Sequence, residues 1–114
     1  VLPAPARLYV LAHELTHWTR HPSRLDRDFG RKRHGDEGYA REELVAEMGA
    51  AFLCGHCGIN AELQHAGYIA HWLEALRHDK RLVFTAASMA QKAADFVLST
   101  SEVAPCPQAM AMAA

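Results

Sequence analysis

The sequence predicts a mainly α-helical domain of about four helices, with little or no β-sheet. Three observations support this fold class. Apolar residues recur every three or four positions in four segments, which is the spacing of one face of a helix. Alternation with a period of two, the pattern of a half-buried strand, is scarce. A length of 114 residues suits one domain with a single hydrophobic core.

The first helix is expected from about Ala6 to Thr19. Pro5 suits its first turn, where the missing N–H of proline has no helical partner in any case. The stripe expected to be buried consists of Leu8, Leu11, Ala12 and Leu15. Pro22 ends this pattern. The charged segment 23–38 has three glycines and no periodicity, so we expect a long loop, and loops of this length are often functional.

Three further helices are expected downstream. The second runs from about Glu37 to Cys54 and ends at Gly55 or Gly58. Its buried stripe is expected to be Leu44, Met48, Ala51 and Phe52. The third starts at the N-cap residue Asn60, with an apolar stripe of Ile69, Trp72, Leu73 and Leu76. The fourth runs from about Leu82 to Leu98 with Val83, Ala87, Ala90, Ala94 and Val97 on one side.

The hexapeptide HELTHW at residues 13–18 carries the clearest chemical signal. Residues four apart on an α-helix share a face, so His13 and His17 can bind one metal ion, and neutral imidazole suits Zn²⁺. Glu14 is turned by roughly 100° from His13. That angle keeps it off the metal but near a metal-bound water, whose proton it can accept. The pattern H-E-x-x-H therefore predicts a zinc site with Glu14 as general base, against the alternative of two ordinary surface or core-edge histidines.

A third protein ligand is expected from the acidic sequence REELVAE at residues 41–47. Glu43 and Glu47 are four apart, so both can face the first helix. We predict that Glu43 binds the metal and that Glu47 lies behind it, accepting the free N–H of a ligand histidine. Glu42 is expected to face away from this pair and is the reserve candidate. Water would take the fourth position, as in zinc sites of catalytic type.

Four other features have both a functional and a structural interpretation. His65 and Tyr68 are candidates to stabilise an oxyanion, or are ordinary residues of a helix face. The basic loop 24–34 can contact DNA phosphates, but its interleaved acids equally fit a solvated loop with local ion pairs. The sequence CGHC at 54–57 has thiol–disulfide exchange spacing, yet it falls at a predicted helix C-terminus, which favours a structural or incidental role. A second zinc site would have to use Cys54, Cys57 and His56 or Cys106.

Composition excludes some classes of protein. Lys and Arg number 12 against 13 Asp and Glu, which argues against a nucleic-acid binder held by overall charge. No apolar run approaches the roughly 20 residues that span a bilayer, and no signal peptide is visible. Three cysteines do not suggest a disulfide scaffold, so a cytoplasmic location is the default. Because the chain does not begin with Met, we expect the C-terminal part of a longer protein, with a domain over 1–98 and a flexible tail over 99–114.

Five segments together extend the signal well beyond the metal motif. They are HELTHW, HPSRLDRDFG, GDEGYAREELVAEMGAAFLC, HAGYIAHWLEALRHDKR and FTAASMAQKAADFVL. This set closely resembles the zincin-like metallopeptidase domain of ArdC-type antirestriction proteins, which also occurs in TraC-type plasmid primases and phage polyvalent proteins. The resemblance covers about residues 8–98. It implies His13, His17 and Glu43 as ligands of zinc, with manganese as an alternative, and Glu14 as base.

The resemblance also implies a biological setting. Such proteins travel on mobile elements, shield incoming DNA from restriction and carry an N-terminal segment that binds single-stranded DNA. The sequence thus predicts a zinc metallopeptidase domain acting on an unidentified peptide or protein. The alternative is a binding protein instead of an enzyme, namely a metal-stabilised module that blocks a restriction enzyme or binds DNA without hydrolysis. A third interpretation is a helical remnant with an empty metal site.

Overall fold

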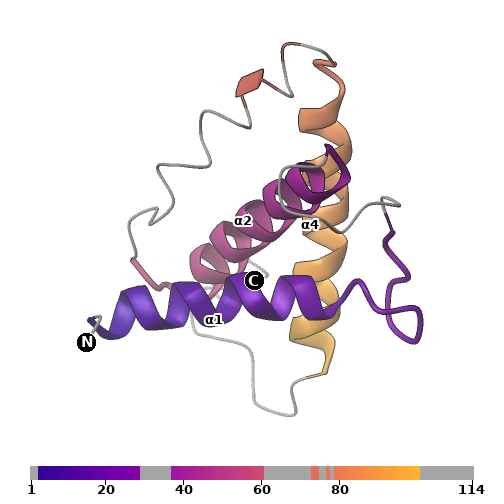
Figure 1. Ribbon diagram of the computed structural model, residues 1–114. Helices are drawn as coiled ribbons and strands as arrows, with labels where there is room; N and C mark the ends of the chain where they lie inside the picture. Colours follow the sequence, from indigo (N-terminus) through magenta and orange to yellow (C-terminus); the bar gives the residue numbers. More distant parts are fainter. Residues whose placement is uncertain (1–2, 29–36, 61–72, 75–76, 78, 101–114) are drawn as a thin grey trace, which may run out of the picture.

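Three helices make up most of the part of the chain that the structure describes, which comprises residues 3–28, 37–60, 73–74, 77 and 79–100 of a computed structural model (Figure 1). They are α1 (Ala4–Trp18), α2 (Glu37–Cys57) and α4 (Leu82–Ser99). Those described residues contain no strand, and the mainly α-helical class predicted from the sequence is confirmed. The predicted third helix falls largely outside the described residues.

The helix ends follow from local chemistry. Pro5 lies in the first turn of α1, where no N–H is needed. Gly58, rather than Gly55, follows the end of α2 and has a φ of 71°, a left-handed conformation that suits glycine. Beyond it, the N–H of Ile59 donates to the carbonyl of Cys54 at 2.8 Å, which closes the helix end. The observed bounds differ from the predicted ones by at most three residues. Helix α1 begins two residues earlier and ends one residue earlier than predicted, α2 continues to Cys57, and α4 continues to Ser99.

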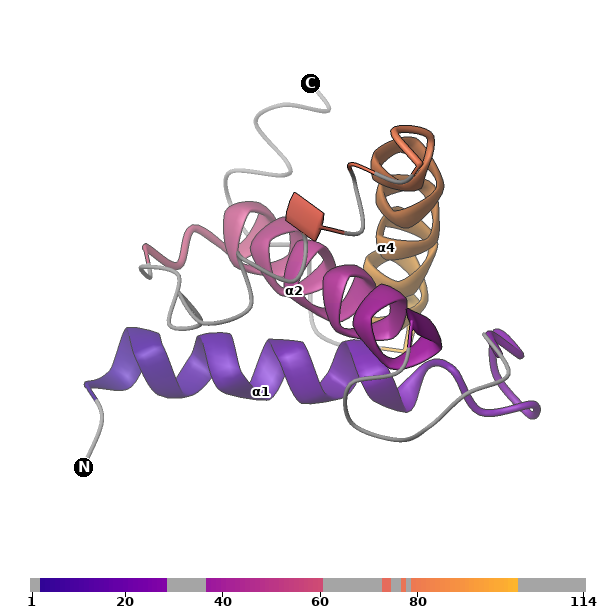
Figure 2. The same cartoon turned by 45° about the horizontal axis from the view of Figure 1, so that its top comes forward.

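Helix α2 is the central element, because it packs on both α1 and α4 (Figures 1 and 2). Every residue from 42 to 47 is buried, so no single side of this stretch of α2 is left to solvent. Two apolar clusters flank the helix. The first joins α1, α2 and α4 through Tyr9, Ala12, Ala50, Leu53, Cys54 and Ala94. The second joins α2 and α4 through Leu44, Val45, Ala86 and Ala90.

The predicted apolar stripe of α1 is wrong for its leucines and right for Ala12, which is buried. Leu8 and Leu11 are 44% and 54% exposed, and Leu15 is half-buried. The buried face consists of Ala6, Tyr9, Ala12, His13 and Thr16. The physical reason is that the polar side chains of this face have hydrogen-bond partners, so their burial costs little. Tyr9 and His13 bond to Glu47 of α2. Thr16 bonds to the carbonyl of Ala12. Hydrophobicity alone could not reveal that arrangement.

The other predicted stripes are partly right. In α2, Leu44 is buried and Met48 and Phe52 are half-buried, but Ala51 is exposed. A single apolar stripe does not describe the burial of α2, because this helix packs on α1 and on α4. In α4, Ala90 and Ala94 are buried as expected, and the other three members of the stripe are half-buried.

A glycine sets how closely α1 and α2 approach. A Cβ added to Gly49 would lie 2.5 Å from Cγ2 and 2.6 Å from Oγ1 of Thr16. Thr16 is fully buried, and its hydroxyl donates to the carbonyl of Ala12 at 2.8 Å, which leaves it little freedom to move aside. Absence of a side chain at position 49 therefore permits the close crossing that brings the motif histidines to α2.

Among the described residues, none of the helices combines the length and apolar content needed to cross a membrane.

Candidate metal centre

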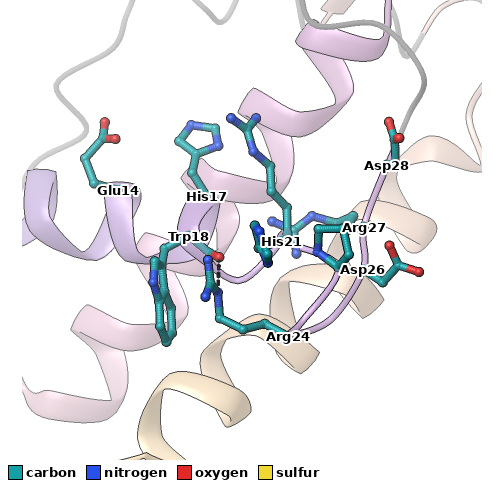
Figure 3. Close-up of a pocket in the computed structure, with 10 residues that line it drawn as sticks. Glu14, His17, Trp18, His21, Arg24, Asp26, Arg27 and Asp28 are labelled. Atoms are coloured by element: carbon teal, nitrogen blue, oxygen red, sulfur yellow. Dashed lines mark hydrogen bonds between the residues drawn. The ribbon is translucent and has the colours of Figure 1, made fainter.

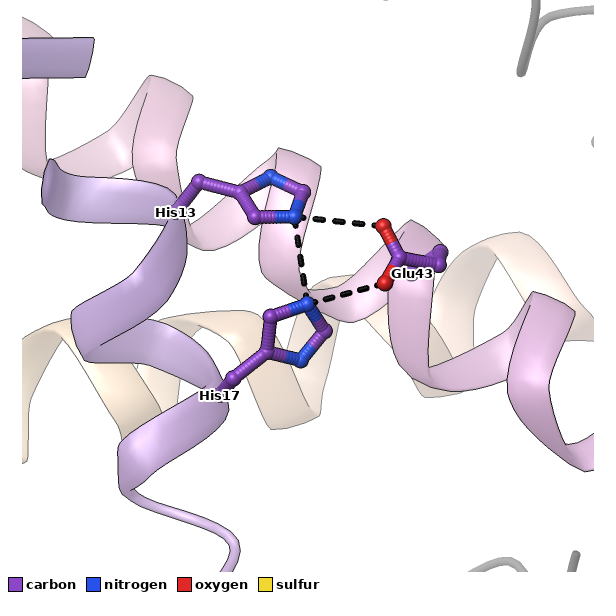
Figure 4. A group of neighbouring side chains, drawn as sticks. All are labelled: His13, His17 and Glu43. Carbon is purple, nitrogen blue, oxygen red and sulfur yellow. Dashed lines mark hydrogen bonds and ion pairs between the residues drawn. The ribbon is translucent and has the colours of Figure 1, made fainter. Parts of the chain in front are cut away.

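The two motif histidines of α1 meet Glu43 of α2 at the crossing of the helices (Figure 4). Nε2 of His13 lies 3.1 Å from Oε2 of Glu43, and Nε2 of His17 lies 3.0 Å from Oε1 of the same carboxylate. The two Nε2 atoms are 3.1 Å apart. The structure thus brings together the three side chains that the sequence predicted as metal ligands. They are also the one group of three potential ligands found among the described residues.

The opposite ring nitrogen of each histidine faces a second carboxylate. Nδ1 of His13 lies 2.9 Å from Oε2 of Glu47, as expected for a carboxylate behind a ligand histidine. Nδ1 of His17 lies 2.8 Å from Oε2 of Glu42. The prediction that Glu42 faces away from the histidines is therefore wrong. The correction has a simple cause: α2 is buried around residues 42–47, so adjacent positions can both reach α1.

Two further residues hold these carboxylates in place, and sequence reasoning missed both roles. The hydroxyl of Tyr9 donates to Oε1 of Glu47 in a short hydrogen bond. Arg27 donates to Glu42 from Nε at 2.7 Å and from Nη2 at 2.9 Å. Tyr9 lies four residues before His13 on the same helix face, a spacing that could have revealed it. No sequence signal links Arg27, in the segment after α1, to a glutamate on α2.

The charges of the centre stabilise one another. Burial by itself would lower the pKa of His13, but hydrogen bonds to Glu43 and Glu47 outweigh it and raise the pKa to about 9. Burial would raise the pKa of Glu43, yet the hydrogen bonds from His13 and His17 lower it to about 2. The pKa of His17 is raised because its hydrogen bonds to Glu42 and Glu43 outweigh burial. Burial raises the pKa of Tyr9 far above its usual value, so its hydroxyl stays a donor to Glu47.

The residues present fit a divalent metal ion. Two imidazole nitrogens and one carboxylate form the donor set of catalytic zinc sites. Ligand atoms of a tetrahedral ion with bonds of ~2.0–2.1 Å lie ~3.3 Å apart. The two Nε2 atoms lie 3.1 Å apart, and each lies 3.0–3.1 Å from a different oxygen of the Glu43 carboxylate. Both histidines turn Nε2 inward and Nδ1 toward a carboxylate, so Nδ1–H can donate to that carboxylate when Nε2 binds a metal.

An open pocket of about 420 Å³ lies beside the centre (Figure 3). Glu14 and His17 line it from α1, and the segment that follows α1 lines the other side with residues that include Arg20, His21 and Asp28. In Figure 3 the Glu14 carboxylate and the His17 ring project from the same side of α1. Glu14 is exposed, and no described residue forms a hydrogen bond or ion pair with its carboxylate. A substrate in this pocket would meet both side chains.

Several other residues predicted from the sequence lie outside the described part of the chain, namely His65, Tyr68, Cys106 and most of the basic loop. Arg27, which was grouped with that loop, is buried and paired with Glu42, so it is not available to phosphates. Cys54 is buried and Cys57 exposed at the C-terminal end of α2, and neither forms a disulfide with a described residue. Burial and the neighbouring Cys57 raise the pKa of Cys54, the opposite of the lowered pKa of a redox-active thiol.

Comparison with known proteins shows the same relationship along most of the chain. The family model described as "zincin-like metallopeptidase" matches residues 5–89. A DNA primase TraC of Escherichia coli is 48% identical over 99 residues, which is 85% of this chain. The y4eC protein of Sinorhizobium fredii is 46% identical over 96 residues, or 82% of the chain. The crystal structure of the Mn(II)-bound antirestriction protein ArdC from plasmid R388 superposes with a TM-score of 0.75 at 46% identity over 84% of the chain.

These relatives are much longer than the present chain. It spans 9% of the TraC primase, 31% of y4eC and 36% of the ArdC chain. The match is therefore to one part of each relative, and that part includes the H-E-x-x-H helix and the acidic helix that meets it. On the family model and these identities, the chain belongs to the zincin-like metallopeptidase family found in TraC-related and ArdC-related proteins.

Proposed function

We propose that the chain is a metal-dependent metallopeptidase domain of an antirestriction or mobile-element protein, with His13, His17 and Glu43 as the metal ligands. The observation that carries the proposal is the convergence of two Nε2 atoms and one carboxylate within 3.1 Å, each imidazole being held from behind by another carboxylate. The Mn(II)-bound ArdC relative supports a divalent ion. Zn²⁺ is the first candidate by donor set and Mn²⁺ the second.

The reaction proposed is hydrolysis of a peptide bond. A bound divalent metal supplies Lewis-acid polarisation and lowers the pKa of a water molecule towards ~7. The Glu14 carboxylate accepts the proton of the attacking water and returns it to the leaving nitrogen. Glu42 and Glu47 keep the two imidazoles in place through their Nδ1 atoms. The pocket beside His17 receives the substrate, and His65 and Tyr68 remain the candidates for stabilising the oxyanion.

A second candidate function is a metal-stabilised binding module that blocks a restriction enzyme or binds DNA without hydrolysis. The antirestriction activity in the name of the ArdC relative favours it, since that name describes protection of DNA rather than cleavage of a peptide. In this alternative the metal ties α1 to α2 and leaves Glu14 without a chemical role. Both candidates require the same three ligands.

Elemental analysis of the purified protein tests the metal centre that both candidates share. We expect wild-type protein to retain close to one equivalent of divalent metal after dialysis and His13→Ala to retain almost none. His21→Ala is the matched control, because His21 is an exposed histidine that bonds with Ser23 instead of Glu43. Equal metal content in wild type and His13→Ala would contradict the centre.

Glu14→Gln separates the two candidates. The substitution keeps the size of the side chain and removes the basic carboxylate, and Glu14 is exposed, so the fold and the metal content should be unchanged. For a peptidase, cleavage of an unstructured protein substrate should fall by about 10²–10⁴-fold. For a binding module, protection of DNA from restriction should persist in Glu14→Gln and should disappear in His13→Ala.

A further inference from the structure

We infer that Arg27 is a positioning residue for the metal centre. Through Glu42 it connects His17 to the wall of the pocket, which is the segment 20–28 that follows α1. The inference rests on the proposed metal site and adds a residue that lines the pocket and whose hydrogen bonds go to groups other than the three proposed metal ligands. Arg27 lies beyond the end of α1, yet its side chain is buried against both α1 and α2. That placement makes it a bridge between three parts of the structure.

The guanidinium of Arg27 is satisfied by groups that also shape the centre. Nε and Nη2 donate to the two oxygens of Glu42 at 2.7 and 2.9 Å, a two-pronged pairing that suits the planar fork of arginine. Nη1 donates to the hydroxyl of Thr19 at 3.0 Å, and Nη2 also donates to the carbonyl of Thr16 at 2.9 Å. Because lysine has neither the fork nor as many donors, it cannot reproduce this set of bonds.

The pairing determines where the Glu42 carboxylate can point. Oε1 accepts from Nε of Arg27, and Oε2 lies 2.9 Å from Nη2 of Arg27 and 2.8 Å from Nδ1 of His17. Without the guanidinium, Glu42 would be a buried carboxylate with His17 as its remaining partner. The carboxylate would then be free to rotate toward His17 or toward water, and the ring of His17 would lose the fixed orientation that aims Nε2 at the centre.

The same residue anchors the segment that walls the pocket. The chain folds back on the end of α1, where the N–H of Leu25 donates to the carbonyl of Thr19 at 2.9 Å and the N–H of Arg27 donates to the carbonyl of Arg20 at 2.9 Å. Asp26 adopts a positive φ of 50° at this return. The side chain of Arg27 reaches Glu42 from the end of this segment, so the stability of the segment and the orientation of the His17 ring are linked. Such a link is reciprocal. Metal binding at His17 should therefore protect the segment against local unfolding.

A Mn²⁺ titration followed by electron paramagnetic resonance tests the inference on Arg27→Met, Arg27→Lys and Glu42→Gln. We expect Arg27→Met to bind Mn²⁺ 10–100-fold more weakly than wild type, as is usual when a group behind a ligand is removed. The double variant with Glu42→Gln should be no weaker than Arg27→Met alone, because both changes break one link. Arg20→Met is the matched control: it lines the same wall, and its side chain makes no hydrogen bond or ion pair with a described residue.

Two readouts separate positioning from a purely structural role. The visible spectrum of the Co²⁺-loaded protein should change in Arg27→Met and stay unchanged in Arg20→Met, because the first alters ligand orientation. Hydrogen exchange over residues 20–26 should slow on Mn²⁺ binding in wild type and not in Arg27→Met. Arg27→Lys keeps the charge and guards against loss of folding, and we expect it to bind Mn²⁺ with intermediate affinity.

The outcomes distinguish this inference from the proposed function. If wild-type protein binds Mn²⁺ and all Arg27 variants bind it equally well, the positioning role is overturned while the metal centre stands. An unchanged Co²⁺ spectrum together with a lowered melting temperature would likewise assign Arg27 to folding alone. If wild type binds neither Mn²⁺ nor Co²⁺, the metal centre fails and the positioning role falls with it.

Discussion

Each imidazole of the centre is engaged at both of its ring nitrogens. Nε2 of His13 and of His17 lies beside the Glu43 carboxylate, and Nδ1 lies beside Glu47 or Glu42. Without metal, such a cluster of carboxylates favours protonated histidines. The carboxylates that orient the rings for metal binding therefore also favour the proton that competes with the metal.

This competition gives the metal affinity a pH dependence of known sign. The pKa of His13 is raised to about 9 in the metal-free protein, so its imidazolium must lose a proton before Nε2 can bind an ion. We expect the affinity for Zn²⁺ to increase as the pH rises from 6 and to level off near pH 9. Calorimetry in buffers with different heats of protonation should also detect proton release at pH 7. An affinity that is constant between pH 6 and pH 9 would contradict this prediction.

At the scale of the element, the crossing of α1 and α2 decides whether the centre exists. The crossing is close because Gly49 faces Thr16, and Thr16 lies between His13 and His17 in the sequence, on the buried side of α1. Close approach is what allows a glutamate side chain on one helix to reach imidazoles on the other. The metal centre and the helix contact are therefore not separable features.

Gly49→Ala should damage both stability and metal binding. The added methyl group would overlap the side chain of Thr16, which is fully buried and bonded to its own helix. Overpacking of this kind costs about 1–3 kcal/mol, so the midpoint of urea unfolding should fall. Gly55→Ala is the matched control, since nothing lies within 4 Å of a Cβ at that position. Equal midpoints for the two variants would show that α1 and α2 can separate without cost.

The leucines of α1 provide a second test at this scale, because hydrophobicity and burial disagree there. Leu11 is 54% exposed, whereas Leu53 of α2 is buried in the first apolar cluster. Leu53→Ala should lower the free energy of unfolding by about 2–5 kcal/mol. Leu11→Ala should change it by about 0.5 kcal/mol or less. Denaturant titrations of both variants check the contrast, and a large loss in Leu11→Ala would mean that this face of α1 is covered in solution.

At the scale of the whole molecule, α2 holds the chain together. It contributes Glu42, Glu43 and Glu47 to the centre on one side and packs its apolar side chains on α4 on the other. At the C-terminal end of α1, Trp18 contacts Phe96 of α4 with ring centroids 5.9 Å apart. A ligand that joins α1 to α2 therefore acts on most of the described structure.

Metal binding should consequently raise the stability of the folded protein. At a free metal concentration 100 times the dissociation constant, one site adds about 2.7 kcal/mol, if the unfolded chain does not bind. For a domain of this size, the melting temperature should rise by roughly 10 °C. Differential scanning calorimetry with Zn²⁺ and with a chelator measures the shift. His13→Ala should show none, and a shift of equal size in that variant would place the ion elsewhere.

Local patterns determined the helical class, the approximate bounds of the three described helices and the pairing of His13 with His17. All of these depend on the spacing of residues within one helix, which a period of 3.6 residues makes readable from sequence. That Glu43 and Glu47 both face the histidines also followed, because an acidic pair four apart shares a helix face. His65 and Tyr68 stay predictions, since they lie outside the described residues.

Only the tertiary structure decided which groups hold the centre from behind. Tyr9 reaches Glu47 across 38 positions of the chain, and Arg27 reaches Glu42 across 15. Which face of α1 is buried was settled in the same way, against its hydrophobic pattern. These pairings depend on the angle and closeness at which two helices cross, and that geometry is set by the fit of side chains such as Thr16 against the space left by Gly49. Spacing along one helix holds no information about such a fit.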